Sequence, residues 1–425
     1  MFGKLLSRFT QHDTVKALGP GLITGAADDD PSGIATYSQA GAQFGFNMLW
    51  TIVLTYPFMV GIQLVSARLG RVTGRGLAAN IRRAYPPSLL YLIVLLLLVA
   101  NIINIAADIA AMGEAMRLVT QHGPAHYYSL GFGFLCLSLQ IFLPYRTYVH
   151  YLKWLTLALL AYVATVLVIH VPWSEVALRT VWPQFAWNNA SVTVIVAIFG
   201  TTISPYLFFW QASQEVEEIR ADTGAQALRK APEDAKIHLK RIKTDTVIGM
   251  GFSNLVAFFI ILATATTLAA HGVTNIQTSA QAAEALRPLA GEFAFLLFAL
   301  GIVGTGLLAV PVLAGASAYA VTESFRWDNG LDLKMLQARE FYAIISLATI
   351  GGIALNFAPI DPIKALFWSA LINGVIAVPI MAVMMLLARE PRIMGTFTLS
   401  RRHTVIGWMG VAIMLIAVVA MFATL

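Results

Sequence analysis

Long apolar runs separated by short polar stretches cover nearly the whole chain. A helix that spans a bilayer needs about 20 largely apolar residues, and by this measure the sequence predicts about eleven transmembrane helices. We place these helices at 17–40, 47–70, 89–116, 126–144, 150–171, 190–216, 240–268, 286–320, 339–357, 363–388 and 403–425. The connections between them are short, so residues 1–425 are expected to form a single all-α polytopic membrane domain.

The composition agrees with this interpretation. Of the 425 residues, 58% are hydrophobic and 12% are charged, and the mean hydropathy of +0.72 lies outside the range of soluble globular proteins. The N-terminal stretch is too polar for a signal peptide and has no small-residue cleavage pattern, so we expect the first apolar segment to be retained. Cys136 is the only cysteine, which excludes an intramolecular disulfide and a cysteine-ligated metal cluster.

The distribution of basic residues predicts the orientation in the membrane. Positive charge is retained on the cytoplasmic side. With a cytoplasmic N-terminus, all 28 Lys and Arg residues fall on the inner side except Arg117, Arg179, Arg287 and Lys364. We therefore expect an outward C-terminus, and the net charge of +6 requires no nucleic acid partner. The longest inner connection, 217–243, mixes both signs of charge and is expected to form a solvated or membrane-surface helix.

The first apolar segment is interrupted by the sequence DDDPSG. An uncompensated Asp at the centre of a membrane helix costs about 2.5–3.5 kcal/mol, so Asp28, Asp29 and Asp30 together cost roughly 8–10 kcal/mol. Pro31 interrupts the helical hydrogen bonds and frees backbone carbonyls beside the carboxylates. Oxygen ligands with negative charge favour a hard cation. The alternative is a helix that ends at Asp30 with its aspartates in water, but the apolar pattern continues beyond the break.

The sixth apolar segment carries a similar interruption, GTTISP, in which Gly200 and Pro205 bracket three hydroxyl residues. Segments one and six begin two sets of five helices, and because five is odd the second set starts on the opposite side of the membrane. Interrupted helices at matching positions of two inverted halves indicate a midplane site in a secondary transporter. The sequence thus predicts one repeat within 1–171, which includes the N-terminal tail, a second within 190–388, and an extra helix at 403–425. A simple proline kink at Pro205 is the alternative.

Several stretches together carry a family resemblance. They read GPGLITGAADDDPSG, AGAQFGFNMLW, IQLVSARLGRVTGRGL, DIAAMGEAM and DTVIGMGFSNLVAFFI, and they follow in order over most of the membrane core. In these stretches the chain resembles the natural resistance-associated macrophage protein (Nramp) family of divalent-metal transporters. The resemblance implies a LeuT-type fold with a 5+5 inverted repeat plus one extra helix, and a bacterial inner (plasma) membrane as the location.

The departures from the family pattern fall on its metal site. Family members carry Asp-Pro-Gly-Asn in helix one and Met-Pro-His in helix six, where this chain has Asp30-Pro31-Ser32-Gly33 and Ser204-Pro205-Tyr206. Loss of the methionine thioether removes the preference for soft metals and leaves oxygen ligands. Small residues also widen the cavity. A wider cavity suits Mg²⁺, because this ion usually keeps several of its water ligands. In these features the chain is similar to the Nramp-related magnesium transporters, which implies transport of Mg²⁺ and Mn²⁺.

Asp30 is the first candidate ligand, direct or through water, because it occupies the family's ligand position. Asp29 is the second, and Asp28 is either a ligand or part of the entry path. Backbone carbonyls and the Ser204 hydroxyl add contacts, mostly through water. The predicted metal site comprises Asp30, Asp29, Asp28, Gly33, Ala27, Thr201 and Ser204. Asn373 either joins this site from the far wall or forms a helix–helix hydrogen bond.

Proton coupling is not expected. The family's two helix-six histidines correspond to Tyr206 and Gln211 here, and Ala111 stands where an acid is usual in helix three. All eight histidines lie in tails, loops or helix ends by this assignment, at positions 12, 122, 126, 150, 170, 238, 271 and 403. Proton relays in membranes use Asp, Glu and His chains. Asp108 remains, either with a transport role or paired with a cation such as Arg339.

We therefore predict a secondary transporter or uniporter that moves divalent cations, Mg²⁺ and also Mn²⁺, by alternating access without proton coupling. The alternative is a proton-coupled Mn²⁺/Fe²⁺ importer like ordinary family members, and a Na⁺-coupled small-solute carrier is more remote. A channel would need rings of like residues across subunits, and a membrane metalloenzyme would need His or Cys ligands. We expect no enzymatic activity, no cofactor besides the transported ion, and no partner except divalent ions and the lipid bilayer.

Overall fold

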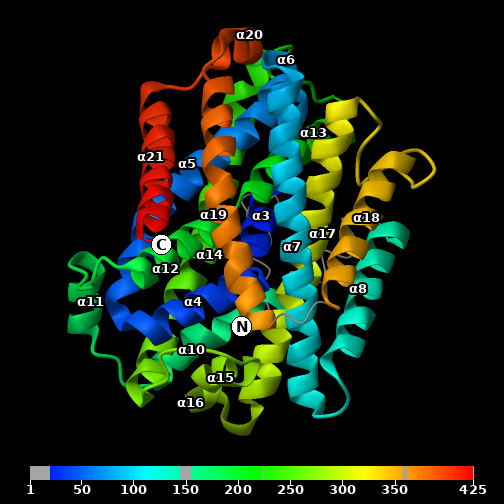
Figure 1. The fold of residues 1–425 in the computed structure, drawn as a ribbon. Coiled ribbons are helices and arrows are strands. Elements are labelled where there is room, and N and C mark those ends of the chain that lie inside the picture. The colour runs from blue at the N-terminus through cyan, green and yellow to red at the C-terminus, as the bar shows by residue number, and fades with distance from the viewer. Residues whose placement is uncertain (1–19, 144–154, 223, 358–360, 425) are drawn as a thin grey trace, which may run out of the picture.

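The structure, a computed structural model, describes residues 20–143, 155–222, 224–357 and 361–424. The described residues form a bundle of α-helices joined by short connections (Figure 1), and none of them lies in a β-strand. Each of the eleven segments expected from the apolar pattern contains a helix. The starts expected at 17–19 and 150–154 lie outside the described residues.

Two of the expected segments are each split into a pair of helices. The first consists of α3 (Pro20–Asp28) and α4 (Pro31–Phe44), and the sixth consists of α12 (Asn189–Thr202) and α13 (Pro205–Ala221). The long helices are α5 (Leu49–Thr73), α7 (Pro87–Thr120), α8 (Ala125–Phe142), α14 (Ala235–Thr267), α17 (Ala294–Phe325), α18 (Arg339–Leu355), α19 (Pro362–Leu387) and α21 (Arg401–Thr424). The fifth segment is a 3₁₀ turn (Leu155–Leu159) followed by α10 (Leu160–Val168).

Short helices occupy the connections. They are α6 (Leu77–Ala84), α11 (Trp173–Val181), α15 (Ser279–Ala283), α16 (Arg287–Ala290) and α20 (Pro391–Met394). Further 3₁₀ turns lie at Gly45–Met48, Pro232–Asp234, Ala269–His271, Glu284–Leu286, Gly291–Phe293 and Gly395–Phe397. Figure 1 shows α6 and α20 at one end of the bundle and α15 and α16 at the other. We refer to these as the α6/α20 end and the α15/α16 end.

Within the described residues, seven helical stretches are long and apolar enough to cross a membrane, and α10 with α11, bent by 119°, make an eighth if counted as one span. This number is below eleven for three reasons. Residues Pro31–Thr73 form one continuous stretch that joins α4 to α5. In addition, α3 and α18 are short, with 9 and 17 residues. Helix α8 is long enough at 18 residues, but its polar side chains lower its mean hydropathy.

The surface helix expected within 217–243 does not form, and that prediction was wrong. Instead α13 continues to Ala221 and α14 begins at Ala235. The turn between them docks on the end of α5, where the amides of Leu228 and Arg229 donate to the carbonyls of Arg71 and Val72, both at 3.2 Å. These bonds use backbone groups that a separate helix would have used itself.

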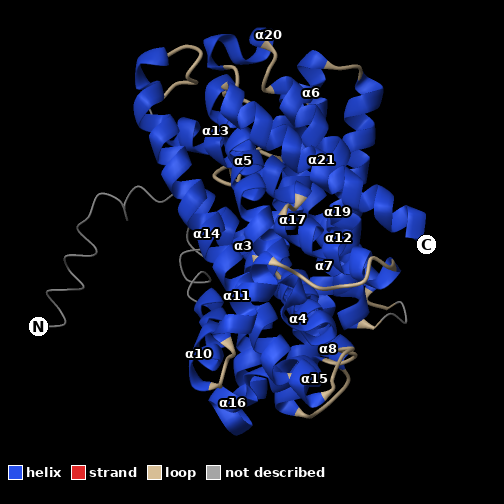
Figure 2. Cartoon of the chain, turned by 90° about the vertical axis from the view of Figure 1, so that its left-hand side faces the viewer, coloured by secondary structure: helices blue, strands red, loops and turns tan. Residues whose placement is uncertain are grey.

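The two split helices run in opposite senses. Figures 1 and 2 place α13 toward the α6/α20 end and α4 toward the α15/α16 end, and α3 and α12 meet them near the middle of the bundle. The chain therefore enters the centre along α3 and leaves along α4, but enters again from the opposite end along α12. This arrangement agrees with two inverted halves.

Glycines allow the split helices to pack very closely on their neighbours. A Cβ on Gly25 of α3 would collide with the backbone carbonyl group of Gly249 on α14 and lie 2.8 Å from its Cα. A Cβ on Gly200 of α12 would lie 2.7 Å from the Cα of Gly374 on α19. Small residues at such crossings let membrane helices approach backbone to backbone.

We expect Gly25→Ala to destabilise the protein by about 1–3 kcal/mol, because the added methyl group must push α3 away from α14. Gly131→Ala in α8 is the control, since a Cβ there has nothing within 4 Å and should be neutral or stabilising by about 0.5–1 kcal/mol. The measurement is the thermal midpoint of the detergent-purified protein. Equal midpoints for the two variants would contradict the close contact.

Candidate metal site between the split helices

Prolines fix the position of both helix breaks. Pro31 and Pro205 each occupy the first turn of the second half-helix, α4 and α13. Proline fits this position because its missing N–H would have no helical partner there, whereas inside a helix it breaks the hydrogen-bond ladder. The three aspartates therefore end α3 and begin α4, and Ser204 precedes α13.

Asp30 is the N-cap of α4. Its Oδ1 accepts hydrogen bonds from the amide of Gly33 at 2.8 Å and the hydroxyl of Ser32 at 2.6 Å. Its Oδ2 accepts from Asn104 Nδ2 of α7 at 3.3 Å. The carboxylate is 1% exposed, so the alternative in which the aspartates cap a helix end in water is wrong. Asp30 caps the continuing half-helix inside the bundle and faces α7.

Asp28 and Asp29 turn to a different neighbour, Ser253 on α14. The Ser253 hydroxyl oxygen lies 2.7 Å from Asp28 Oδ2 and 3.0 Å from Asp29 Oδ1. Since a hydroxyl has a single proton, Ser253 serves only one carboxylate at a time. The other oxygens, Asp28 Oδ1 and Asp29 Oδ2, are buried without a hydrogen-bond partner. The structure thus brings Asp28 and Asp29 together and holds Asp30 separately.

No Lys, Arg or His of the described residues forms an ion pair with these three aspartates. Each aspartate is 1% exposed, and burial of unpaired charge is strongly unfavourable. No three His, Cys, Asp or Glu side chains in the described parts of the chain are arranged to hold one metal ion. A cation here would therefore combine one or two carboxylates with carbonyl, hydroxyl or water oxygens.

The remaining predicted residues border the same break. A Cβ on Gly33 would lie 3.2 Å from Thr201 Oγ1 and 3.6 Å from the Asp28 carbonyl oxygen, so these groups meet across the two split helices. Thr201 Oγ1 is buried without a partner. The Ser204 hydroxyl donates back to the end of α12, with the carbonyls of Gly200 and Thr201 at 3.0 and 2.9 Å.

The halves of the split helices are joined in pairs. On the α6/α20 side, Tyr206 of α13 donates its hydroxyl to the Ala27 carbonyl of α3 at 2.9 Å, and Thr24 donates to Gln211 Oε1 at 2.5 Å. On the other side, the hydroxyls of Tyr37 in α4 and Thr202 in α12 are 3.1 Å apart. Tyr206 and Gln211, at the family's histidine positions, therefore connect the two half-helices. The Ala27 carbonyl keeps a second lone pair for other contacts.

Asp108 of α7 is fully buried, and neither of its carboxylate oxygens has a hydrogen-bond partner. Arg339 is exposed at the start of α18, so the alternative in which Asp108 pairs with Arg339 is wrong. The described histidines lie in loops or near helix ends, as expected, and His12 and His150 lie outside the described residues.

Asn373 of α19 is 1% exposed, and its amide oxygen and nitrogen both lack a partner. The alternative of a helix–helix hydrogen bond was therefore wrong for this residue. Its neighbour Gly374 contacts Gly200 at the end of α12, which places Asn373 beside the second break. The amide oxygen of Asn373 therefore keeps both lone pairs available for another contact.

Apolar side chains separate the aspartates from the α15/α16 end. A cavity of about 10 Å³ lies between α4, α7, α15, α17 and α19, and its lining includes Ile34, Phe298 and Leu366. Beyond it opens a wider vestibule of 190 Å³ with polar side chains, among them Gln39, Asn275 and Lys364. The narrow cavity has room for about one water molecule, so the site is closed on this side.

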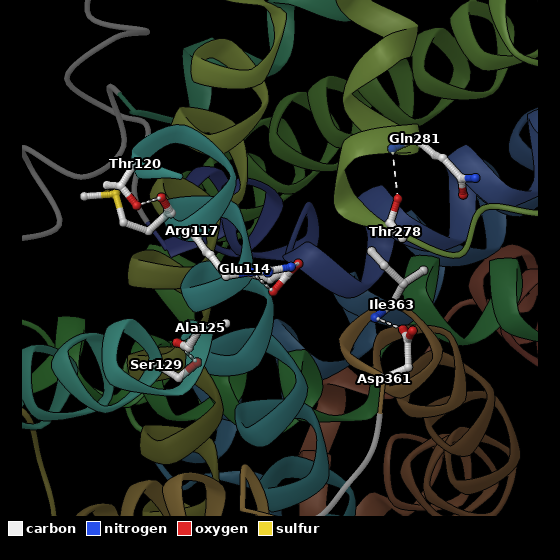
Figure 3. Close-up of polar contacts among 10 residues, drawn as sticks. Glu114, Arg117, Thr120, Ala125, Ser129, Thr278, Gln281, Asp361 and Ile363 are labelled. Atoms are coloured by element: carbon white, nitrogen blue, oxygen red, sulfur yellow. Dashed lines mark hydrogen bonds and ion pairs between the residues drawn. The ribbon is translucent and has the colours of Figure 1, made fainter. Parts of the chain in front are cut away.

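Two helix caps and one glutamine lie at this end. Figure 3 shows the cap of α19, Asp361 with Ile363, and the cap of α15, Thr278 with Gln281. Asp361 Oδ1 accepts from the Ile363 amide at 2.9 Å, and Thr278 Oγ1 accepts from the Gln281 amide at 3.2 Å. In α4, Gln39 accepts from the Ile276 amide at 2.9 Å and donates to the Thr274 carbonyl at 3.3 Å. The loop before α15 is therefore attached to α4.

Polar contacts attach α3 and α13 to α14 toward the α6/α20 end. The amide of Gly21, at the start of α3, donates to Asp245 Oδ2 on α14 at 2.7 Å. Arg241 of the same helix pairs with the buried Glu215 of α13 at 2.5 Å. Both half-helices on this side are thus attached to α14.

Sequence reasoning missed Ser253 and Asn104. Asn101, Asn104 and Asp108 are spaced three and four residues apart, so they share one face of α7, and this polar spacing in an apolar helix would have identified Asn104. Ser253 lies in a stretch that was quoted for the family resemblance, but one serine in a membrane helix has no distinguishing pattern.

Comparisons with known proteins agree with this arrangement. Residues 21–424 match the family model described as natural resistance-associated macrophage protein-like. The chain is 27% identical over 411 residues to the divalent metal cation transporter MntH of Acidiphilium cryptum, covering 94% of this chain and 88% of that protein. It is also 27% identical to the MntH of Deinococcus radiodurans, covering 94% and 87% of the two chains.

Solved structures share the fold. The manganese transporter of Eremococcus coleocola matches with a TM-score of 0.72 at 17% identity, covering 97% of this chain and 88% of that one. The nucleobase-cation-symport transporter Mhp1 matches with a TM-score of 0.55 at 14% identity, covering 96% and 92%. These likenesses confirm the predicted LeuT-type membrane fold.

We expect Ser253→Ala to weaken Mn²⁺ binding by the purified protein about tenfold or more. The hydroxyl is the one described donor to Asp28 and Asp29, and a hydrogen bond to an ionised group contributes about 1.5–3 kcal/mol. Ser369→Ala is the control, because Ser369 is equally buried but bonds only to the Leu366 carbonyl of its own helix. Isothermal titration calorimetry gives the dissociation constants, and identical values for both variants would contradict this role for Ser253.

Proposed function

Because the chain belongs to the natural resistance-associated macrophage protein-like family, we propose that it transports divalent metal cations across a membrane by alternating access. One observation carries this proposal. Three aspartates are buried at the break of two half-helices, and none is paired with a basic side chain of the described residues. A bound cation supplies the missing positive charge, and ionisable groups placed inside a membrane bundle mark ion pathways.

The proposed orientation places the α6/α20 end in the cytoplasm. The connections at 74–86, 224–234, 326–338 and 388–400 lie at this end (Figure 1). Together with the helix ends that border them, they carry all the described Lys and Arg residues except Arg117, Arg179, Arg287 and Lys364. Retention of positive charge on the inner side then places α15 and α16 outside. In this orientation the N-terminus is cytoplasmic, and the named bacterial relatives favour a bacterial inner membrane.

Manganese is the proposed principal cargo. The relatives are named for divalent metal cations and, in the solved structure, for manganese, which favours the importer that the sequence left as the alternative. The chemistry of the site agrees, because carboxylate, carbonyl and water oxygens suit Mn²⁺ as well as Mg²⁺. Ser204 in place of a methionine leaves no thioether at the helix-six position that would favour Cd²⁺.

Magnesium is the second candidate, favoured by the size of the residues at the site. Gly33 and Ser204 leave more space than the asparagine and methionine of ordinary family members, and Mg²⁺ keeps much of its hydration shell. The membrane potential alone can drive the entry of such an ion without a coupled proton, since two charges that cross 100 mV gain about 4.6 kcal/mol.

The contacts at the two ends describe how access would alternate. Outward opening requires α4 to separate from the apolar side chains around the narrow cavity, together with the loop held by Gln39. Inward opening requires α3 to leave Asp245 and α13 to leave Arg241. A cation between the split helices lowers the repulsion among the aspartates, and this favours the occluded arrangement.

We expect Asp30→Ala and Asp30→Asn both to abolish Mn²⁺ uptake into proteoliposomes, because both remove the negative charge. Asn is a good N-cap, so only the Ala variant should also lose about 1 kcal/mol of stability. Asp361→Ala is the matched control, since Asp361 caps α19 at the surface; it should lose similar stability and keep its uptake. Normal uptake by a folded Asp30→Asn protein would contradict the site.

We expect saturable Mn²⁺ uptake that Cd²⁺ does not outcompete, because the site lacks sulfur. Uptake of Mn²⁺, Mg²⁺ and Cd²⁺ is compared in the same liposomes with a pH-sensitive dye inside and a fixed membrane potential. Saturable Mg²⁺ uptake with unchanged internal pH would favour the second candidate. Acidification that needs the metal and disappears in Asp108→Asn would establish proton coupling through Asp108. A strong preference for Cd²⁺ would contradict the oxygen-only site.

A further inference from the structure

Two adjoining cavities lead from the α15/α16 end toward Asp30. Helix α4 runs from the first break toward this end (Figure 2). The vestibule of 190 Å³ and the narrow cavity of about 10 Å³ share three lining residues, Ala35, Ile276 and Ile363, so the two adjoin. The lining of the narrow cavity includes Ile34, whose amide donates to the Asp30 carbonyl at 3.1 Å. A cation that enters from this end therefore passes the vestibule before it reaches the Asp30 carboxylate.

The vestibule has one charged side chain among the described residues of its lining. That lining contains three neutral amides and one basic side chain, and its other residues are apolar. The amides are Gln39, Gln43 and Asn275, and the basic side chain is Lys364 of α19. Lys364 is exposed and belongs to none of the ion pairs in the described parts of the chain. The described lining thus has a positive charge and no carboxylate.

Asp361, one helical turn before Lys364, is not paired with it. Asp361 caps the start of α19 (Figure 3), where its Oδ1 accepts from the amides of Ile363 and Lys364 at 2.9 and 3.2 Å. The Asp361 and Lys364 side chains form no ion pair, and Asp361 is not part of the described lining. The Lys364 ammonium group therefore acts on the vestibule without a paired carboxylate.

A positive charge beside this route opposes the entry of a cation. Across roughly 8 Å of water, a unit charge repels a divalent ion strongly enough to lower the local concentration of that ion about fivefold, and of a monovalent ion about twofold. The charge that lines a cleft sets the local concentration of ions in this way and thereby changes association rates. Lys364 thus reduces the rate at which a divalent ion arrives at the aspartates.

We propose that the positive charge of Lys364 limits how fast divalent cations enter the site from the α15/α16 end. This inference rests on the proposed transport function and identifies a residue that controls its rate. Lys364 acts on the approaching ion and not as a ligand of the bound one, because the narrow cavity lies between the vestibule and Asp30. Repulsion through water is screened by salt, and this separates it from an effect of direct contact.

The first test measures initial rates of Mn²⁺ uptake by the full-length protein in proteoliposomes. At about 10 mM ionic strength, where the Debye length is about 30 Å, Lys364→Gln should raise kcat/KM about fivefold for molecules whose vestibule faces the outer solution. An equal mixture of both orientations then gives about threefold. The maximal rate should not change, and Lys364→Arg should behave as the parent protein does. At 1 M salt, where the Debye length is about 3 Å, the difference should disappear.

The matched control removes the same charge elsewhere at the α15/α16 end. Arg287 of α16 is exposed and is not part of the described lining of the vestibule, so Arg287→Gln should leave kcat/KM unchanged. An equal rise in this control would show that only net charge matters and would overturn the proposal. A rise in Lys364→Gln that persists at 1 M salt would also overturn it, because Lys364 would then act by contact or through the structure.

The second test reads the charge of the vestibule without transport. Gln43 is exposed in the vestibule, and the native Cys136 is buried, so Gln43→Cys introduces one accessible thiol. The detergent-purified protein is labelled with a cationic and an anionic methanethiosulfonate reagent, without any metal. Since Lys364 slows the cation and speeds the anion about twofold each, adding Lys364→Gln should lower the ratio of anionic to cationic rates about fivefold.

The two tests separate this inference from the proposed function. An unchanged labelling ratio in a protein that transports Mn²⁺ would overturn the role of Lys364 and leave the transport function in place. A labelling ratio that falls as expected, in a protein that takes up no divalent cation under any condition, would overturn the transport function and with it the role of Lys364 in entry.

Discussion

The structure depends on one constraint: a helix broken inside a membrane must satisfy its freed backbone groups without water. Asp30 meets this constraint at the first break, because its carboxylate accepts from the Gly33 amide and the Ser32 hydroxyl. The Asp30 carboxylate that accepts the freed amide of α4 is thus the same group that contributes negative charge to the candidate metal site. A neutral cap would stabilise the helix equally well but would leave the cation with less charge to bind.

The contacts around the breaks divide the four half-helices into two pairs. Tyr206 and Gln211 join α13 to α3, and Tyr37 joins α4 to Thr202 of α12. The carboxylates of Asp28 and Asp29 are held in turn by Ser253 on α14. Movement of α3 therefore changes the position of the Ala27 carbonyl and of two carboxylates together, so the candidate ligand set changes with it.

Much of the fold was predictable because the membrane imposes a strong pattern on sequence. Apolar length located all eleven helical segments, and Pro31 and Pro205 located both breaks. The connection at 217–243 was not predictable in the same way, since its conformation depends on backbone bonds to Arg71 and Val72, far away in the sequence. Composition carries no information about such docking.

The candidate site was predictable in its residue types but not in its geometry. Three adjacent aspartates indicated a cation, yet their side chains diverge because Pro31 turns the chain between α3 and α4. Asp28 and Asp29 reach α14, whereas Asp30 reaches α7. The absence of a partner for Asp108 likewise follows from the distant placement of Arg339, and neither fact is visible in local sequence.

The contact between α3 and α14 has a kinetic consequence. Gly21 and Gly25 rest on the backbone of α14 near Thr246 and Gly249, so at these two positions backbone meets backbone without an interlocked side chain. Dispersion attraction between two backbones is lost within a small separation. At these positions no side chain has to be withdrawn from a pocket on the partner helix. Departure of α3 is therefore expected to be abrupt, with few intermediate positions, and the helix behaves as a two-position switch.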